Sequence, residues 1–158
     1  MRIDYAELSL IGARDDNQDR VSAAVAEHAA MLVAVDGMGG HADGDRAAEV
    51  TLKVLVEAFW HTPQPLFDPI GFLHLTLGRA HDAVVQLGAS LPIENRPRAT
   101  CAVCLVQGES AYWAHVGDSR VYHVRRGRIA ERTRDHSHVE LLIREGLISE
   151  EQALAHPM

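Results

Sequence analysis

The hydrophobic period of the chain changes twice along the sequence, and this change constrains the fold more than any other feature. Over residues 70–87, apolar side chains recur in steps of three and four, the spacing of an α-helix with one buried face. Asp68 and Pro69 precede this stripe as a capping acid and a proline suited to the first helical position. An earlier stripe of the same period predicts a helix over 46–60, which the prolines after His61 end. The two buried faces are expected to contain Ala48, Leu52, Leu55 and Phe59 in the first helix, and Ile70, Leu73, Leu77, Ala80, Val84 and Leu87 in the second.

Short segments rich in Val, Ile and Leu lie on both sides of the helices and predict β-strands. The expected strands span 3–11, 21–26 and 31–35 before the helices, and 99–106, 110–116, 120–124 and 128–132 after them. Tight turns join the later strands and predict an antiparallel meander. The tail predicts a helix over 136–145 that stops at Gly146, and a short helix opened by a capping box at 149–152. Strands, helices and further strands in this order favour an α+β fold.

Composition restricts the kind of protein further. The chain has 158 residues, of which 47% are hydrophobic, and this suits one packed domain over 1–158. Its net charge of −7 argues against a general nucleic-acid binder, because such binding needs a basic face. The longest apolar run, 29–35, is too short to cross a bilayer, and the N-terminus has no signal-peptide layout. We therefore expect a cytoplasmic monomer with neither a nucleic-acid nor a membrane partner.

Acidic residues gather in three loops, each at the end of an expected strand. These loops are 14–20, 36–45 and 117–120. Asp36 ends an apolar strand, and the glycines after it allow a tight turn that exposes carbonyl oxygens. A fixed carboxylate beside free carbonyls and a second acidic loop suits a hard cation such as Mg²⁺ or Mn²⁺. The alternative is that Asp36 caps the helix that follows.

Other residues of interest also have two interpretations. Arg14 carries a guanidinium that can hold a phosphate through two hydrogen bonds, or it can pair with a neighbouring aspartate. Asp118 stands in a Gly-Asp-Ser sequence, which is ordinary turn chemistry. Cys101 and Cys104 form a lone CxxC pair whose thiols point to opposite faces of a strand, so they are better interpreted as buried cysteines than as a zinc site.

Taken together, the loops resemble a known family. The motifs are, in chain order, Arg14-x-x-Asn17-Gln-Asp19, Asp36-Gly-Met-Gly-Gly40, Val116-Gly-Asp-Ser-Arg120 and Thr133-Arg-Asp-His-Ser137. This series resembles the metal-dependent protein phosphatases of the protein phosphatase 2C (PPM) family, in its bacterial form. The resemblance implies an α-β-β-α fold, with two antiparallel β-sheets sandwiched between α-helices.

The resemblance also implies a function. Phosphatases of this family hydrolyse phosphoserine and phosphothreonine in proteins with water activated by two Mn²⁺ or Mg²⁺ ions, and bacterial members hold a third. Carried over by motif position, Arg14 binds the phosphate and Asp36 bridges two ions. Gly37 offers its carbonyl to one ion, Asp19 lies beside the same ion, and Asp118 helps to hold the third. The implied partner is a phosphorylated protein, such as a Ser/Thr kinase or its target.

This sequence departs from the family pattern in its C-terminal part. The resemblance implies two more metal-binding aspartates there, in a C-terminal Asp-Gly and a C-terminal Asp-Asn motif, together with further strands, and this sequence ends at Met158 before both. The fold is therefore expected to be incomplete at the C-terminus, with 136–156 forming a flap near the active site. The alternative function is that of a non-catalytic pseudophosphatase, or of a partial domain that binds a phosphoprotein or a partner.

Overall fold

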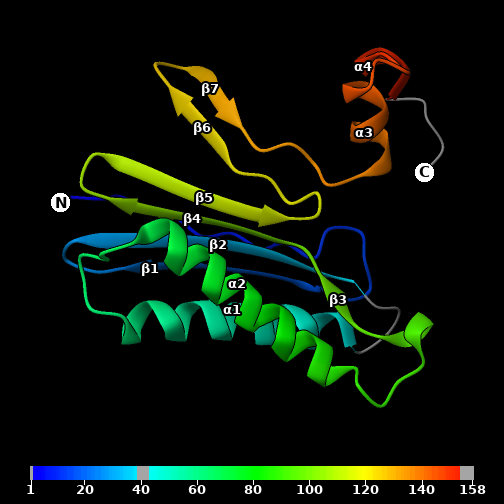
Figure 1. Cartoon of the computed structure of the whole chain (residues 1–158), viewed down its shortest axis with the longest axis horizontal. Helices are drawn as coiled ribbons and strands as arrows, with labels where there is room; N and C mark the ends of the chain where they lie inside the picture. Colours follow the sequence, from blue (N-terminus) through cyan, green and yellow to red (C-terminus); the bar gives the residue numbers. More distant parts are fainter. Residues whose placement is uncertain (1, 39–42, 154–158) are drawn as a thin grey trace.

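The computed structural model describes residues 2–38 and 43–153 of the chain (Figure 1). Its strands are β1 (Asp19–Val25), β2 (Ala29–Met38), β3 (Arg98–Ala99), β4 (Cys101–Gln107), β5 (Ser110–Val116), β6 (Tyr122–Arg125) and β7 (Arg128–Arg132). Its helices are α1 (Asp43–His61), α2 (Pro69–Leu87), α3 (His138–Arg144) and α4 (Glu150–Ala153), with a short 3₁₀ helix at Ile93–Asn95. This composition of strands and helices confirms the α+β prediction.

The strands form two antiparallel sheets. The larger sheet has the order β1-β2-β4-β5, and β3 pairs with the end of β2. The smaller sheet is the β6–β7 hairpin. Two antiparallel sheets were expected and are confirmed, but the single meander is wrong. The connection over 117–120 leads the chain away from the larger sheet, so β5 and β6 do not pair.

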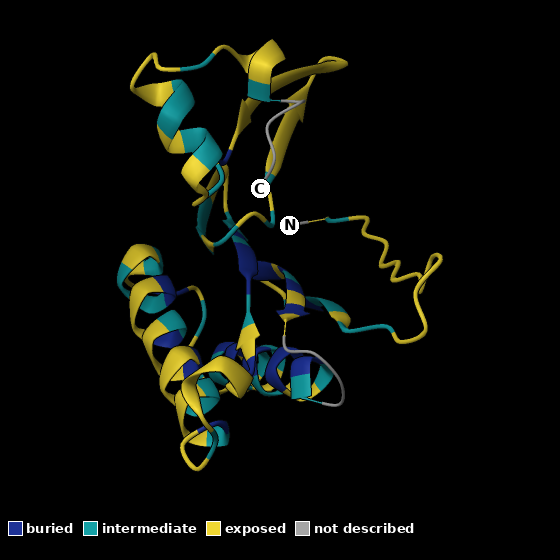
Figure 2. Cartoon of the chain, turned by 90° about the vertical axis from the view of Figure 1, so that its right-hand side faces the viewer, coloured by how far each residue is buried: buried dark blue, intermediate teal, exposed yellow. Residues whose placement is uncertain are grey.

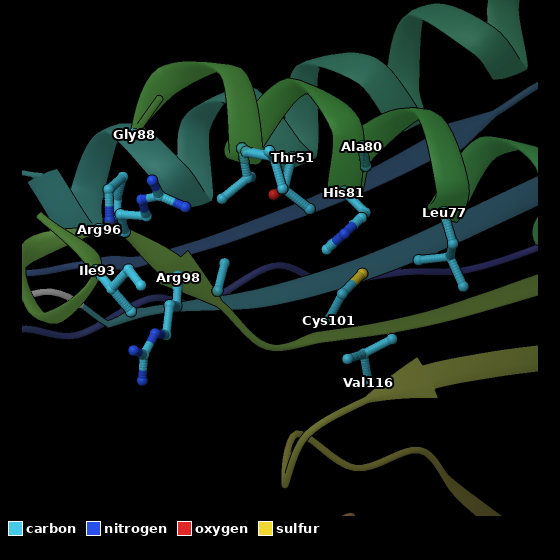
Figure 3. A pocket seen from close by; sticks show the side chains of 14 residues that line it. Thr51, Leu77, Ala80, His81, Gly88, Ile93, Arg96, Arg98, Cys101 and Val116 are labelled. Carbon is cyan, nitrogen blue, oxygen red and sulfur yellow. The ribbon is translucent and has the colours of Figure 1, made fainter. Parts of the chain in front are cut away.

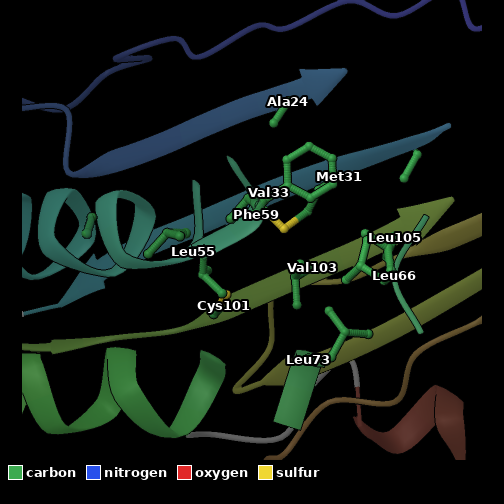
Figure 4. Close-up of a cluster of buried hydrophobic side chains, with 13 residues drawn as sticks. Ala24, Met31, Val33, Leu55, Phe59, Leu66, Leu73, Cys101, Val103 and Leu105 are labelled. Atoms are coloured by element: carbon green, nitrogen blue, oxygen red, sulfur yellow. The ribbon is translucent and has the colours of Figure 1, made fainter. Parts of the chain in front are cut away.

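Helices α1 and α2 cover one face of the larger sheet, and the hairpin lies on the other side of it (Figures 1 and 2). Side chains alternate along β2, so that Met31, Val33 and Val35 point to the helices and are buried. They meet Leu55 and Phe59 of α1 in the core (Figure 4). The buried residues gather between the two long helices and the larger sheet, whereas every residue of β6 and β7 is exposed.

Both long helices confirm the prediction made from their period. The Asp68 side chain caps α2 by accepting a hydrogen bond from the Gly71 amide at 2.9 Å. Helix α1 begins earlier than expected, because Asp43 and Asp45 place negative charge in its first turn. Most residues of the two faces that were expected to be buried are buried or half-buried. The main exception is Ile70, which is 67% exposed at the start of α2. No helix among the described residues is long and apolar enough to span a membrane.

The tail also forms the local structure that its sequence predicts. Ser137 caps α3 by accepting a hydrogen bond from the Glu140 amide at 3.1 Å, and Gly146, with φ of 72°, follows the end of that helix. Ser149 and Gln152 form the reciprocal bonds of the capping box, at 2.8 and 3.1 Å. Both helices of the tail are therefore confirmed.

The strand expected over 3–11 is wrong, since the structure has no strand there. A strand needs a neighbour that takes its backbone hydrogen bonds, and no ladder pairs this segment with another strand of the described chain. The segment instead contacts β1 through the Glu7 carboxylate, which accepts a hydrogen bond from the Ala23 amide. Its apolar side chains remain exposed, including Leu8 at 74% and Leu10 at 70%.

The two cysteines confirm the prediction that they face opposite sides of a strand. Cys101 is buried in the core beneath the helices, and Cys104 is half-buried on the other face of β4. Both thiols are free. Burial raises the pKa of Cys101 to about 12, so this thiol stays protonated at neutral pH and acts as an apolar group.

Candidate functional site

The described parts of the three acidic loops lie at one end of the larger sheet (Figure 1). Asp36 lies near the end of β2, and Asp19, the first residue of the antiparallel β1, is directly opposite it in the register. Asp118 follows the end of β5 at the same edge. Because Asp36 is within β2 and α1 begins only at Asp43, the alternative that Asp36 caps this helix is wrong.

The electrostatics of Asp36 show that these carboxylates act on one another. Its pKa is raised above the ordinary value for an aspartate, first by partial burial. The charges of Asp19 and Asp118 raise the pKa further, as does a hydrogen bond with the Asp19 side chain. Arg14 acts in the opposite direction and lowers it. The three other side chains that the sequence singled out are therefore close enough to influence the Asp36 carboxylate.

Arg14 lies in the loop before β1, where its backbone amide donates a hydrogen bond to the Ile11 carbonyl at 3.3 Å. It is exposed. Among the described residues, its guanidinium forms no ion pair with Asp15 or Asp16, which was the alternative interpretation. This side chain is thus available to a ligand while its charge acts on Asp36.

Gly37 joins two of the loops by close packing. It is buried at the end of β2, and its amide donates a hydrogen bond to the Gln18 carbonyl at 3.1 Å. On its other side it meets Gly44, in the first turn of α1, so closely that a side chain at Gly37 would overlap the Gly44 backbone. The end of β2, the loop before β1 and the start of α1 are thereby held together.

The donor set of the site fits a divalent metal ion by its chemistry. Asp19, Asp36 and Asp118 offer carboxylate oxygens, which Mn²⁺ and Mg²⁺ accept, and a cation would relieve the repulsion that raises the pKa of Asp36. Within 2–38 and 43–153, however, no three His, Cys, Asp or Glu side chains are already gathered around one metal position. Metal binding therefore requires these exposed carboxylates to converge.

An ion pair beside the site was not predicted, although both of its residues lie in the quoted motifs. Arg120 follows the Asp118 turn, and Nε and Nη2 of its guanidinium each donate to an oxygen of Asp135 at 2.6 Å. This pair raises the pKa of Arg120 and lowers that of Asp135. Opposite charges in two motifs were the only signal in the sequence, and they did not specify this pairing.

Replacement of Asp135 by Asn is expected to lower the free energy of unfolding by about 0.5–1 kcal/mol, because Arg120 is partly exposed. The lowered pKa of Asp135 means that this contribution is present above the ordinary pKa of an aspartate and is lost as the pH falls through the folded value. Urea unfolding at pH 7 and pH 3 tests this, with Asp82→Asn on α2 as the control. A difference between parent and variant that is as large at pH 3 as at pH 7 would contradict the assignment.

The segment expected to form a flap begins beside the Asp118 turn. The His136 amide donates to the Gly117 carbonyl at 2.9 Å, and the His136 ring stacks on His115 of β5 with ring centroids 4.3 Å apart. Helices α3 and α4 follow, on the hairpin side of the larger sheet (Figure 1). Residues 154–156 of the expected flap lie outside the described residues. The function as a flap stays a prediction.

A cavity of about 390 Å³ lies between the two long helices and the larger sheet (Figure 3). It is enclosed by α1, α2 and the ends of β3, β4 and β5. Cys101 lines it, on the face of the sheet that Val35 shares, whereas Asp36 alternates to the other face. This cavity is therefore separate from the three carboxylates.

Comparison with known proteins supports the resemblance. Residues 9–140 match the family model described as Protein phosphatase 2C. A protein phosphatase 2C-type relative from Streptococcus pyogenes is 35% identical over 146 residues, which are 91% of this chain and 59% of the relative. The solved structure of the serine/threonine phosphatase PstP/Ppp of Mycobacterium tuberculosis superposes with a TM-score of 0.80 at 30% identity, and covers 96% of this chain.

The chain spans about three fifths of the length of these proteins: 59% of the S. pyogenes relative and 61% of the M. tuberculosis chain. A structure of the catalytic domain of PstP in complex with two manganese ions superposes with a TM-score of 0.77 at 30% identity, covering 89% of this chain and 59% of that one. The family match extends through all three acidic loops and most of the described fold. The chain therefore belongs to the protein phosphatase 2C family.

Proposed function

We propose that the protein hydrolyses phosphoserine and phosphothreonine in proteins with the help of Mn²⁺ or Mg²⁺. The observation that carries this proposal is the placement of Asp19 opposite Asp36 in the register of β1 and β2, with Asp118 and Arg14 near enough to shift the pKa of Asp36. Acidic side chains for metal ions and a cation for phosphate are the two requirements of metal-assisted phosphate-ester hydrolysis. Relatives named serine/threonine phosphatases support the same reaction.

Each residue has a distinct part in this proposal. Asp36 and Asp19, opposite each other on β2 and β1, hold two metal ions with the Gly37 carbonyl, and Asp118 supports a third. When bound, such ions lower the pKa of a coordinated water and so supply a nucleophile at neutral pH. The manganese complex of PstP supports this choice of metal.

Arg14 binds the phosphoryl oxygens of the substrate. Its guanidinium offers hydrogen bonds in a planar arrangement that matches a phosphate, and among the described residues no carboxylate is paired with it. The positive charge of Arg14 stabilises the negative charge that develops on the phosphoryl oxygens. This positive charge already lowers the pKa of Asp36, so Arg14 lies near the proposed metal ligand. We propose a phosphorylated protein as substrate, either a Ser/Thr kinase or the target of one.

Arg14→Ala is expected to reduce kcat/KM for a phosphothreonine peptide by about 100-fold, because one stabilising donor is lost from the transition state. Release of phosphate is measured with and without Mn²⁺, and Arg14→Lys is expected to recover part of the loss. Arg128→Ala in β7, on the small hairpin, is the control and should change kcat/KM by less than about twofold.

The assay uses the folded 158-residue chain and, where the reading frame continues beyond Met158, its longer product. Phosphopeptide binding without turnover, lost in Arg14→Ala, would favour the non-catalytic alternative. If both products lack turnover and also lack phosphopeptide binding, the proposed function is overturned.

A further inference from the structure

Thr100 lies directly beside Asp36, on the side away from Asp19. The register pairs Gly37 with Ala99 and Ala34 with Ala102, which places Thr100 opposite Asp36 between β3 and β4. The Thr100 amide donates to the Asp36 carbonyl at 2.8 Å, and the Asp36 amide donates to Oγ1 of Thr100 at 3.3 Å. One residue therefore holds both backbone polar groups of Asp36.

The same hydroxyl reaches the turn that carries Asp118. Oγ1 of Thr100 forms a hydrogen bond with Oγ of Ser119, the residue after Asp118. A hydroxyl can accept one hydrogen bond and donate another, so the Thr100 hydroxyl can accept from the Asp36 amide and donate to the Ser119 hydroxyl. Two of the acidic loops, on β2 and after β5, are thus linked through a single oxygen atom.

The Thr100 methyl group fixes the same turn by packing. Thr100 is only 2% exposed, and a Cβ placed on Gly117 would lie 2.7 Å from its Cγ2. Gly117 also has a φ of 92°, which favours glycine, so the turn approaches Thr100 as closely as the backbone allows. Thr100 therefore contacts Asp36 on one side, and the Gly117 backbone and the Ser119 side chain on the other.

We infer that Thr100 is a positioning residue, whose hydroxyl sets Asp36 and the Asp118 turn in the relative arrangement that divalent cations require. Thr100 is not itself a ligand in this inference, because its oxygen is already engaged by Asp36 and Ser119. In metal sites generally, groups that hydrogen-bond to the ligands fix the orientation of those ligands, and Thr100 is inferred to do the same for Asp36. The inference rests on the proposed function for the identity of the cation.

The test compares two variants that separate the hydroxyl from the shape of the side chain. Thr100→Val keeps the shape and removes the hydroxyl, whereas Thr100→Ser keeps the hydroxyl and removes the methyl group. Thr100→Val is expected to weaken Mn²⁺ binding about 10–100-fold, and Thr100→Ser by less than about threefold. Binding is measured on the 158-residue chain from the electron paramagnetic resonance signal of free Mn²⁺.

Thr76→Val is the matched control. Thr76 is also 2% exposed, and its hydroxyl donates to the Phe72 carbonyl within α2, away from the acidic loops. Loss of this buried hydroxyl should leave Mn²⁺ affinity unchanged. If Thr100→Val fails to fold, Ser119→Ala breaks the same link from the other end and is expected to weaken Mn²⁺ binding about threefold or more.

A second measurement needs no metal. Amide hydrogen exchange followed by NMR should show the Asp36 amide exchanging about tenfold faster in Thr100→Val than in the parent, with little change in Thr100→Ser. Parental Mn²⁺ affinity in Thr100→Val, or equal losses in Thr100→Val and Thr100→Ser, would overturn the inference. If the parent binds no Mn²⁺, the proposed function fails, and an unchanged Asp36 amide in Thr100→Val would show that the positioning role fails too.

Discussion

An Asp36→Asn variant is expected to bind Mn²⁺ at least about 100-fold more weakly than the parent and to lose Mn²⁺-dependent hydrolysis of para-nitrophenyl phosphate. The loss of a direct carboxylate ligand should exceed the cost of removing a group that only orients one, which is about 10–100-fold. Asp82→Asn, an exposed position on α2, provides the control. Mn²⁺-dependent hydrolysis that survives in Asp36→Asn would exclude Asp36 as a ligand.

The same variant should be more stable than the parent when metal is removed. Burial and the charges of Asp19 and Asp118 raise the pKa of Asp36 above 3.8, so the ionised carboxylate destabilises the folded chain. Stability therefore falls as the pH rises from that ordinary value through the folded pKa, and the penalty remains at neutral pH. In EDTA at pH 7, the Tm of Asp36→Asn should exceed that of the parent, and the difference should shrink below about pH 4. A Tm of Asp36→Asn below that of the parent at pH 7 would contradict this, because it would show that the ionised Asp36 carboxylate stabilises the folded chain.

The sequence predicts those parts of the fold that depend on local interactions. The period over 70–87 and the cap at Asp68 specify α2 because both act within a few turns of one helix. The segment 3–11 has apolar residues at strand-like spacing, yet it forms no strand, because pairing depends on a partner elsewhere in the chain. The turn over 117–120 misled the prediction for a similar reason, since a short connection can join two sheets as well as two neighbouring strands.

The candidate site was predictable to the extent that its residues lie in loops at strand ends. Asp36 was identified from such a loop and Asp19 from the resemblance of its loop to a family motif, and the register of β1 and β2 places them opposite each other. Thr100 could not be found in this way, because its hydrogen bond to Asp36 joins residues 64 positions apart. A threonine between two β segments has no distinctive pattern, and only the assembled sheet shows which groups it links.

Gly37→Ala is expected to lower the free energy of unfolding by about 3 kcal/mol or more, the upper range for overpacking a buried position. A Cβ at Gly37 would lie 2.0 Å from the Gly44 carbonyl oxygen and 2.9 Å from that of Gln18. Both obstacles are backbone atoms, so relief requires β2, α1 or the loop before β1 to shift. Urea unfolding in EDTA measures the effect without any contribution from metal.

Gly78→Ala is the matched control for this substitution. A Cβ at Gly78, inside α2, meets nothing within 4 Å, so alanine there should stabilise the helix by about 0.5–1 kcal/mol. A Gly37→Ala variant as stable as the parent would contradict the close packing at the end of β2. Because that packing holds Gln18 and the start of α1 against the strand that carries Asp36, the destabilised variant should also bind Mn²⁺ more weakly where it remains folded. Gly37 would then contribute to the site through its lack of a side chain, in addition to the metal-binding role proposed for its carbonyl.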